Sequence, residues 1–305
     1  MSAAKGAGML RALLIPLVLV TLFYAASLLR STLVKHAIPK IEAIVLGAVT
    51  NFFDTLGIGS FAPTMAWLKF RNLVPDRLIP CTMLVGHTLP CMAQALIFLV
   101  LLGVLVDPVL LVGCVIALLM GGWLGAPIAA KARVWVVQAV VAAALIIAAV
   151  LYAMTNLDLM PGGGTDSSLP LSLTVVAITA NFVFGILLNF GVGNYAPTLV
   201  MLSLMGMDPK LSFPIMAGGA AFAGAGASMR YLSMGEVDLR IASGIALGGI
   251  PAVLVAAFIV KSMSVEVLRW LVIVVVVYAA IAMFRAALLG RRGELRQSGV
   301  PIAGS

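Results

Sequence analysis

The stretches GIGSFAPT, from Gly57 to Thr64, and GVGNYAPT, from Gly191 to Thr198, are two copies of one motif that lie 134 residues apart. Each copy lies within a long apolar stretch, where glycine and proline interrupt a helix. Two prolines follow each copy at the same spacing: Pro75, Pro80, Pro209 and Pro214. Interrupted apolar segments at corresponding places in two halves of a membrane protein indicate the substrate site of a transporter. The motif therefore predicts a duplicated membrane fold.

The composition is that of an integral membrane protein. Of the 305 residues, 63% are hydrophobic and 10% are charged, whereas about a quarter of a soluble domain is charged. Uncharged runs such as 109–130 and 134–157 have the roughly 20 residues that a membrane helix needs. The net charge of +8 comes from basic residues in small groups between apolar runs. This pattern is typical of loops on the inner side of a membrane, so nucleic acid is not an expected partner.

The chain divides into a first helix, two repeats and a tail. We expect residues 1–40 to hold a retained transmembrane helix, because its apolar run is long for a signal peptide. The first repeat spans 41–155, an external linker 156–170, the second repeat 171–290 and a basic cytoplasmic tail 291–305. The apolar stretches are 9–29, 41–68, 79–104, 108–129, 134–154, 171–205, 212–231, 239–260 and 266–288.

The lengths and flanking charges of these stretches predict their topology. Stretch 171–205 is too long for one span and too short for two, which suits two half-helices that meet at a break. If both motif stretches are re-entrant hairpins and the C-terminus is inside, 14 basic residues lie inside and 5 outside, as the positive-inside rule favours. Each repeat then has three full spans, and this odd number inverts the second repeat relative to the first.

The predicted fold is therefore an all-α integral membrane protein of two inverted repeats. Each repeat has three full spans and a broken re-entrant helical hairpin, and one extra N-terminal helix precedes them. The N-terminus lies outside the cell and the C-terminus in the cytoplasm.

The chemistry of the motif is that of a helix start. Its glycines allow a sharp turn and a close approach to a ligand, and Ser60 and Asn194 are favoured N-cap residues. Pro63 and Pro197 fall in the first turn, where a missing N–H removes no helical bond. Free N–H groups and the positive end of the helix dipole then form an anion site. The predicted substrate-binding residues are Gly57, Gly59, Ser60, Phe61, Thr64, Gly191, Gly193, Asn194, Tyr195 and Thr198. The alternative is that the glycines serve only close helix packing.

Asp54 and His87 are the titratable candidates near the motif. An ionisable group in an apolar stretch is costly, so Asp54 carries a coupling proton, pairs with the end of a helix dipole, or has a structural role as a cap or hydrogen-bond acceptor within its hairpin. Its repeat counterpart is Leu188. His87 either titrates or joins two helices.

Several amides have a supporting role in this interpretation. Asn51, Asn181 and Asn189 precede the breaks and would satisfy backbone groups that the breaks set free. We expect Gln94 and Gln138 to join helices by hydrogen bonds.

No feature of the sequence predicts an enzyme. It contains neither a nucleotide-binding loop nor His, Cys and Glu at metal-ligand spacing, and its three cysteines form no CxxC pair. We expect no catalytic residues, no metal and no cofactor. An ion gradient or the substrate gradient would then drive any transport.

Several short motifs resemble the TauE/SafE family of sulfite exporters. They are the duplicated G-[IV]-G-x-x-x-P element, YLSMGEVDLR at Tyr231–Arg240 with Gly249-Ile250-Pro251 after it, and Gly125-Ala126-Pro127. The resemblance covers roughly 41–288 and implies a bacterial inner-membrane transporter of sulfite, sulfonates such as sulfoacetate, or thiosulfate-like anions. The family often has G-x-G-G-G where this chain has Ser60-Phe61 and Asn194-Tyr195, so Phe61 and Tyr195 would narrow the break and gate or shape the site.

The leading hypothesis is a secondary transporter of a small sulfur-containing anion, coupled to protons and binding the anion at the midplane between two facing helix starts. The alternatives are an uncoupled anion channel, a transporter of a small carboxylate and a membrane scaffold that transports nothing. The expected partners are a small anionic substrate and the lipid bilayer, and a homodimer stays open.

Overall fold

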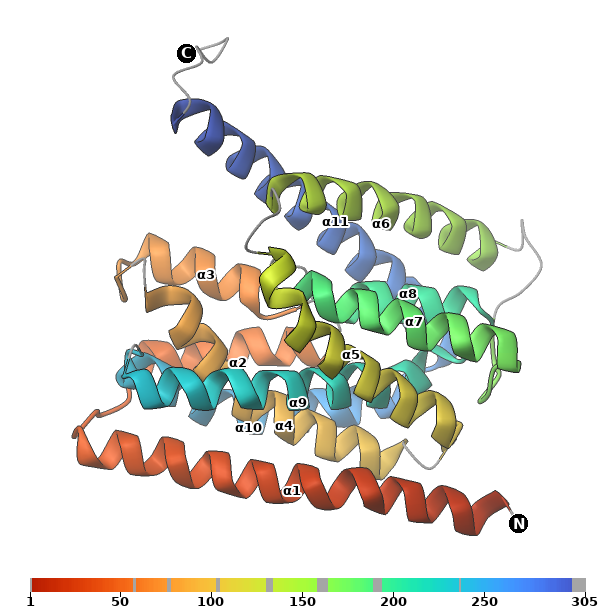
Figure 1. Ribbon diagram of the computed structural model, residues 1–305, viewed down its shortest axis with the longest axis horizontal. Helices are drawn as coiled ribbons and strands as arrows, with labels where there is room; N and C mark the ends of the chain where they lie inside the picture. Colours follow the sequence, from red (N-terminus) through yellow and green to blue (C-terminus); the bar gives the residue numbers. More distant parts are fainter. Residues whose placement is uncertain are drawn as a thin grey trace.

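The computed structural model describes residues 2–56, 59–75, 78–102, 105–129, 134–157, 164–188, 194–235 and 237–297. All the named elements in these ranges are α-helices, which confirms the predicted helical class (Figure 1). They are α1 (Ser2–Val34), α2 (Ile41–Thr55), α3 (Phe61–Phe70), α4 (Ile79–Leu101), α5 (Pro108–Ala129), α6 (Val134–Asn156), α7 (Leu171–Leu188), α8 (Tyr195–Leu204), α9 (Pro209–Met234), α10 (Leu239–Ser262) and α11 (Val265–Gln297).

Each motif-bearing stretch folds into two helices, and each of the other apolar stretches folds into one. Helices α2 and α3 form the first hairpin, and α7 and α8 form the second hairpin. The predicted break within each motif stretch is therefore confirmed. The interruption falls where glycines remove the side chain that would favour a continuous helix.

The helices have the lengths and composition of a multi-pass membrane protein. Among the described residues, α1, α4, α5, α7, α9, α10 and α11 are long and apolar enough to cross a membrane. The remaining hairpin helices are shorter, with 15 residues in α2 and 10 each in α3 and α8. At a rise of about 1.5 Å per residue, these three do not reach across a hydrocarbon core of about 30 Å.

Helices from the two halves of the chain pack against one another to form one body. Helix α2 packs along α10, α7 packs along α5, and α4 contacts α9. Glycines make the first two contacts close: a Cβ at Gly47 would overlap the Ile245 backbone, and a Cβ at Gly185 would overlap the Leu118 carbonyl. Small residues at helix contacts are typical of membrane proteins, because packing rather than the hydrophobic effect holds helices together in lipid.

The open end of each hairpin is the end at which the chain enters and leaves it. Different groups join the two helices there in the two hairpins. In the first hairpin, Glu42 Oε1 accepts hydrogen bonds from Arg71 Nε at 2.8 Å and Trp67 Nε1 at 3.0 Å. In the second, the backbone N–H of Asp166 donates to the Gly206 carbonyl at 3.2 Å. The chain therefore enters and leaves each hairpin at one place.

The two hairpins open at opposite ends of α10 (Figure 1). Lys40, just before α2, donates its backbone N–H to the carbonyl of Arg240 at the start of α10. Lys210, after α8, donates from Nζ to the carbonyl of Lys261 near the end of α10. Helix α10 has 24 residues, or a length of about 36 Å, so the two open ends are far apart and the breaks lie between them.

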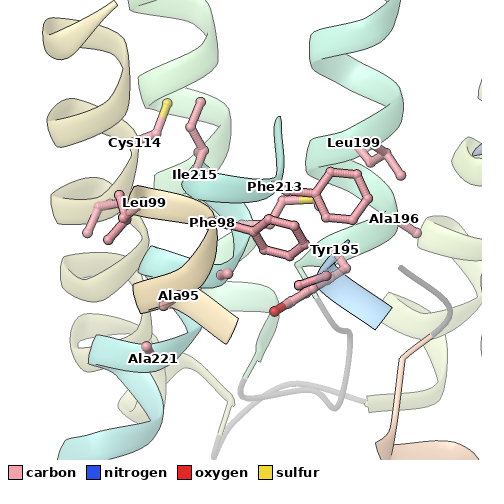
Figure 2. Close-up of a cluster of buried hydrophobic side chains, with 14 of the residues drawn as sticks. Ala95, Phe98, Leu99, Cys114, Tyr195, Ala196, Leu199, Phe213, Ile215 and Ala221 are labelled. Atoms are coloured by element: carbon pink, nitrogen blue, oxygen red, sulfur yellow. The ribbon is translucent and has the colours of Figure 1, made fainter. Parts of the chain in front are cut away.

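A buried aromatic contact joins α4 to α9 next to α8. Figure 2 shows the Phe98 ring of α4 beside the Phe213 ring of α9, with Tyr195 and Leu199 of α8 next to them. The two phenylalanine ring centroids are 4.9 Å apart and tilted by 48°, within the usual range for aromatic pairs. The start of α8 therefore belongs to the same buried cluster as α4 and α9.

Candidate anion site between the two helix breaks

The predicted helix starts are confirmed, but their N-cap side chains act differently from the expectation. Helix α3 begins directly after Ser60 and α8 directly after Asn194, yet neither side chain caps its helix. Asn194 instead donates from Nδ2 to the Met216 carbonyl of α9 at 3.2 Å. The first-turn N–H groups of both helices therefore lack the cap expected from their own N-cap residues.

Gly59 is the motif glycine that the structure describes. Its φ of +89° lies in the region that L side chains rarely adopt, and a Cβ there would meet no atom within 4 Å. Backbone conformation therefore requires this glycine, and there is open space in front of α3. Gly57, Asn189, Gly191 and Gly193 lie outside the described residues.

The side chain of Asp54, near the end of α2, lies at the N-terminus of α3. Its Oδ1 accepts a hydrogen bond from the Ser60 backbone N–H at 2.8 Å, and the Ser60 hydroxyl also bonds to it. A carboxylate of the protein thus occupies the place at which the motif predicts an anion, because a helix start attracts negative charge. The hydrogen bond within the hairpin is the arrangement observed.

His87 of α4 joins both helices of the first hairpin. Its Nδ1 lies 3.0 Å from Asn51 Oδ1 and its Nε2 lies 3.0 Å from Thr64 Oγ1. Asn51 donates its own amide to the Gly47 carbonyl at 2.7 Å, so its oxygen accepts from Nδ1. A neutral ring with its proton on Nδ1 satisfies both bonds, because Nε2 can then accept from the Thr64 hydroxyl.

The second hairpin has a smaller polar contact at the same place. Thr198 Oγ1 donates to Asn181 Oδ1 at 3.3 Å, and Asn181 Nδ2 donates to the Ala177 carbonyl at 2.9 Å. Both motif threonines are thus used between helices. Asn51 and Asn181 bond carbonyls inside α2 and α7, so these bonds are not to backbone groups that a break sets free.

The matched aromatic residues of the motif have unlike surroundings. Phe61 is 45% exposed, and its ring centroid lies 5.5 Å from that of His87. Tyr195 is 9% exposed, and Figure 2 shows its ring lying against the core with the hydroxyl turned away from Phe213. Tyr195 is therefore the member of the pair enclosed between the breaks.

Sequence reasoning missed two residues of α4 that lie beside Tyr195. Its hydroxyl is next to the side chains of Cys91 and Gln94, and the charge of Asp54 acts on both Tyr195 and Cys91. Yet neither the Tyr195 hydroxyl nor either amide atom of Gln94 has a hydrogen bond of acceptable geometry. Gln94 of α4 therefore contacts a second helix, α8, as expected, although no hydrogen bond of acceptable geometry joins the two side chains.

A helical period was the signal that could have found these residues. His87, Cys91 and Gln94 are four and three residues apart, which places them on one face of α4. Of these, Cys91 and Gln94 lie beside Tyr195, and the charge of Asp54 acts on Cys91 and Tyr195. Within the part of the chain that the structure describes, no group of three or more His, Cys, Asp or Glu side chains could hold a metal ion.

Comparison with known proteins identifies the family of the second half. Neither the curated proteins nor the solved structures contain a significant match to this chain. Residues 173–304 match the family described as sulfite exporter TauE/SafE, so the predicted resemblance is confirmed over this part of the chain.

Proposed function

We propose that this protein is a secondary transporter that moves a small sulfur-containing anion across the membrane, coupled to protons. The match of residues 173–304 to a sulfite exporter family supports a sulfur-containing anion as substrate. The observation that carries the proposal is that neither helix start is capped by its own N-cap side chain, and that the charge of Asp54, at the start of α3, acts on Tyr195, the first residue of α8. Such starts hold anions without a buried Lys or Arg.

The opposite placement of the two hairpins supports an inverted-repeat membrane arrangement. The open ends of the two hairpins lie at opposite ends of α10. In a bilayer the two hairpins would therefore enter from opposite faces, and their breaks would meet near the midplane. Alternating access then comes from one repeat moving against the other. In the bacterial inner membrane, the C-terminus would be cytoplasmic and the N-terminus external, as the loop charges favour.

Asp54 supplies a route for proton coupling. A substrate anion beside Asp54 favours the protonated carboxyl, and by reciprocal linkage protonation of Asp54 favours the anion. Anion affinity therefore rises as the pH falls. The other titratable groups at the site are Cys91, Tyr195 and His87. Asp54 is the carboxyl among them, and its ordinary pKa of about 4 makes it the group that carries a negative charge near neutral pH.

The test is transport into proteoliposomes that contain the full chain. With an inward proton gradient, the wild type should accumulate sulfite or a sulfonate above its external concentration. The variant Asp54→Asn should lose this gradient-driven accumulation while still exchanging substrate across the membrane.

Three outcomes would contradict the proposal in different ways. Flux that never concentrates substrate under any ion gradient indicates a channel. Preference for acetate or another carboxylate over every sulfur anion indicates a carboxylate transporter. Unchanged transport in Gly59→Leu, whose side chain would fill the open space before α3, contradicts a site at the helix starts.

A further inference from the structure

We propose that Gln94 and Tyr195 are the neutral hydrogen-bond donors that hold the substrate at the start of α8, and that they select a monoanionic sulfonate group over a dianion. This inference rests on the proposed transport function and names residues and a substrate class for its site. Gln94 lies on α4 and Tyr195 is the first residue of α8, and the two side chains lie next to each other.

The first argument is the missing hydrogen bonds. Gln94 is 0% exposed, and neither its Nε2 nor its Oε1 has a partner. The Tyr195 hydroxyl is also unpartnered, although the two side chains lie side by side. A buried amide or hydroxyl without a partner destabilises the folded protein, and such groups are rare in folded proteins. A ligand that accepts hydrogen bonds from both removes this cost.

The second argument is position. Tyr195 opens a 10-residue helix whose N-cap side chain makes no capping bond. The N–H groups of its first turn point in the same direction as the positive end of the dipole. A tetrahedral oxyanion placed there can accept from the backbone, from the Tyr195 hydroxyl and from the Gln94 amide through different oxygens.

Charge decides which oxyanion fits. The groups that act on Asp54, Cys91 and Tyr195 include no Lys or Arg among the described residues, while the Asp54 carboxylate lies close by. The helix start offers roughly half a positive charge, which can stabilise one negative charge. A dianion would meet about twice the repulsion from Asp54 in a region of low dielectric constant, so the site favours a monoanionic sulfonate.

The test uses methanesulfonate and sulfate, two sulfur oxyanions of similar geometry that differ in charge at neutral pH. Their affinities for the purified full-length protein would be measured by calorimetry in detergent. We expect the wild type to bind methanesulfonate more tightly than sulfate. Gln94→Leu and Tyr195→Phe should each weaken methanesulfonate binding by about tenfold or more, because each removes a hydrogen bond to a charged ligand.

A stability measurement separates binding from a structural role. Without ligand, Gln94→Leu should melt at the same temperature as the wild type or higher, because it removes a buried amide that has no partner. Ser203→Ala is the matched control, since Ser203 is a buried, unpartnered hydroxyl at the other end of α8. This variant should bind methanesulfonate as the wild type does.

Asp54→Asn tests the selection against dianions. Removing the carboxylate should raise the affinity for sulfate more than the affinity for methanesulfonate. Equal changes for the two ions would overturn the charge argument.

The remaining outcomes distinguish this inference from the proposed function. If the wild type binds methanesulfonate and Gln94→Leu binds it within about twofold of the wild-type affinity, Gln94 is not a ligand and only this inference fails. A large loss of stability in unliganded Gln94→Leu would give it a structural role and has the same consequence. If the wild type binds no sulfur oxyanion at all, the proposed function fails as well.

Discussion

The two hairpins share one motif and one backbone course, and they differ in what covers them. In the second hairpin, α6 and α11 pack against α8. Most side chains of α8 are buried: Tyr195, Ala196, Pro197, Thr198, Leu199, Val200, Leu202 and Ser203. In the first hairpin, Phe61, Trp67 and Phe70 of α3 are 45%, 42% and 77% exposed. Duplication thus preserved the helix start, while the surroundings diverged.

The polar groups diverged in the opposite direction. The first hairpin has Asp54 at its break and the bonds between His87, Asn51 and Thr64. The second has Leu188 in place of Asp54 and one long threonine bond. Under the proposed function, we expect a division of roles: the first hairpin would carry charge and proton exchange, and the second would provide an enclosed helix start for the substrate.

Shortening a buried side chain of α8 should have the largest effect on stability. Leu199 of α8 is 1% exposed, whereas its repeat counterpart Met65 of α3 is 38% exposed. Leu199→Ala should lower the free energy of unfolding by about 2–5 kcal/mol, because it leaves a cavity, and Met65→Ala should cost clearly less. Unfolding in mixed detergent micelles measures both, and equal losses would contradict the difference in burial.

The two close contacts between the halves, α2 with α10 and α5 with α7, should be equally sensitive to added side-chain volume. Gly47→Ala and Gly185→Ala each push a methyl group into a neighbouring backbone, which should cost about 1–3 kcal/mol. Gly226→Ala is the control, since a Cβ at Gly226 would meet no atom within 4 Å. Melting temperatures in detergent would show the two losses, and a tolerant Gly185 would mean that α5 and α7 can separate.

Replacing each motif threonine by valine keeps the side-chain shape and tests the difference in polar contacts between the two hairpins. Thr64→Val leaves His87 Nε2 without a partner and should cost about 1–3 kcal/mol. Thr198→Val removes a bond of 3.3 Å and should cost at most about 1 kcal/mol. The same unfolding assay applies, and a larger loss for Thr198 would reverse the proposed division of roles.

The smallest expected effect concerns the open ends of the hairpins. Arg71 holds the pKa of the exposed Glu42 carboxyl below its ordinary value of 4.5, chiefly through its hydrogen bond. Because the folded-state pKa is lowered, the stabilisation exists above pH 4.5 and is lost as the pH falls through the lowered value. Water screens this pair, so the loss should be slight.

Glu42→Gln should remove that acid-dependent loss. The second hairpin is closed by backbone groups of Asp166 and Gly206, which do not titrate. Proteolysis of each loop as a function of pH measures the two closures separately. Acid sensitivity at the second hairpin alone would contradict this account.

Much of the fold follows from local chemistry, which a sequence displays directly. Apolar runs predict the helices, and the glycines and prolines of the motif predict helices that begin after Ser60 and Asn194. The position of Asp54 three residues before Gly57 already indicated an acid at the break. The inverted membrane arrangement stays a prediction, supported by the closure of the hairpins at opposite ends of α10.

The positions of the helix breaks follow from the amino-acid sequence, because backbone conformation depends on the residues at the break. Which polar groups meet at the breaks depends on how the helices pack. Cys91 and Gln94 look like ordinary members of an apolar helix until α8 is placed against α4, and Gln94 then lies beside Tyr195 with no partner. Hydrogen bonding and burial depend on neighbours distant in the chain, so the enclosed α8 and exposed α3 could not be distinguished from two nearly identical motifs.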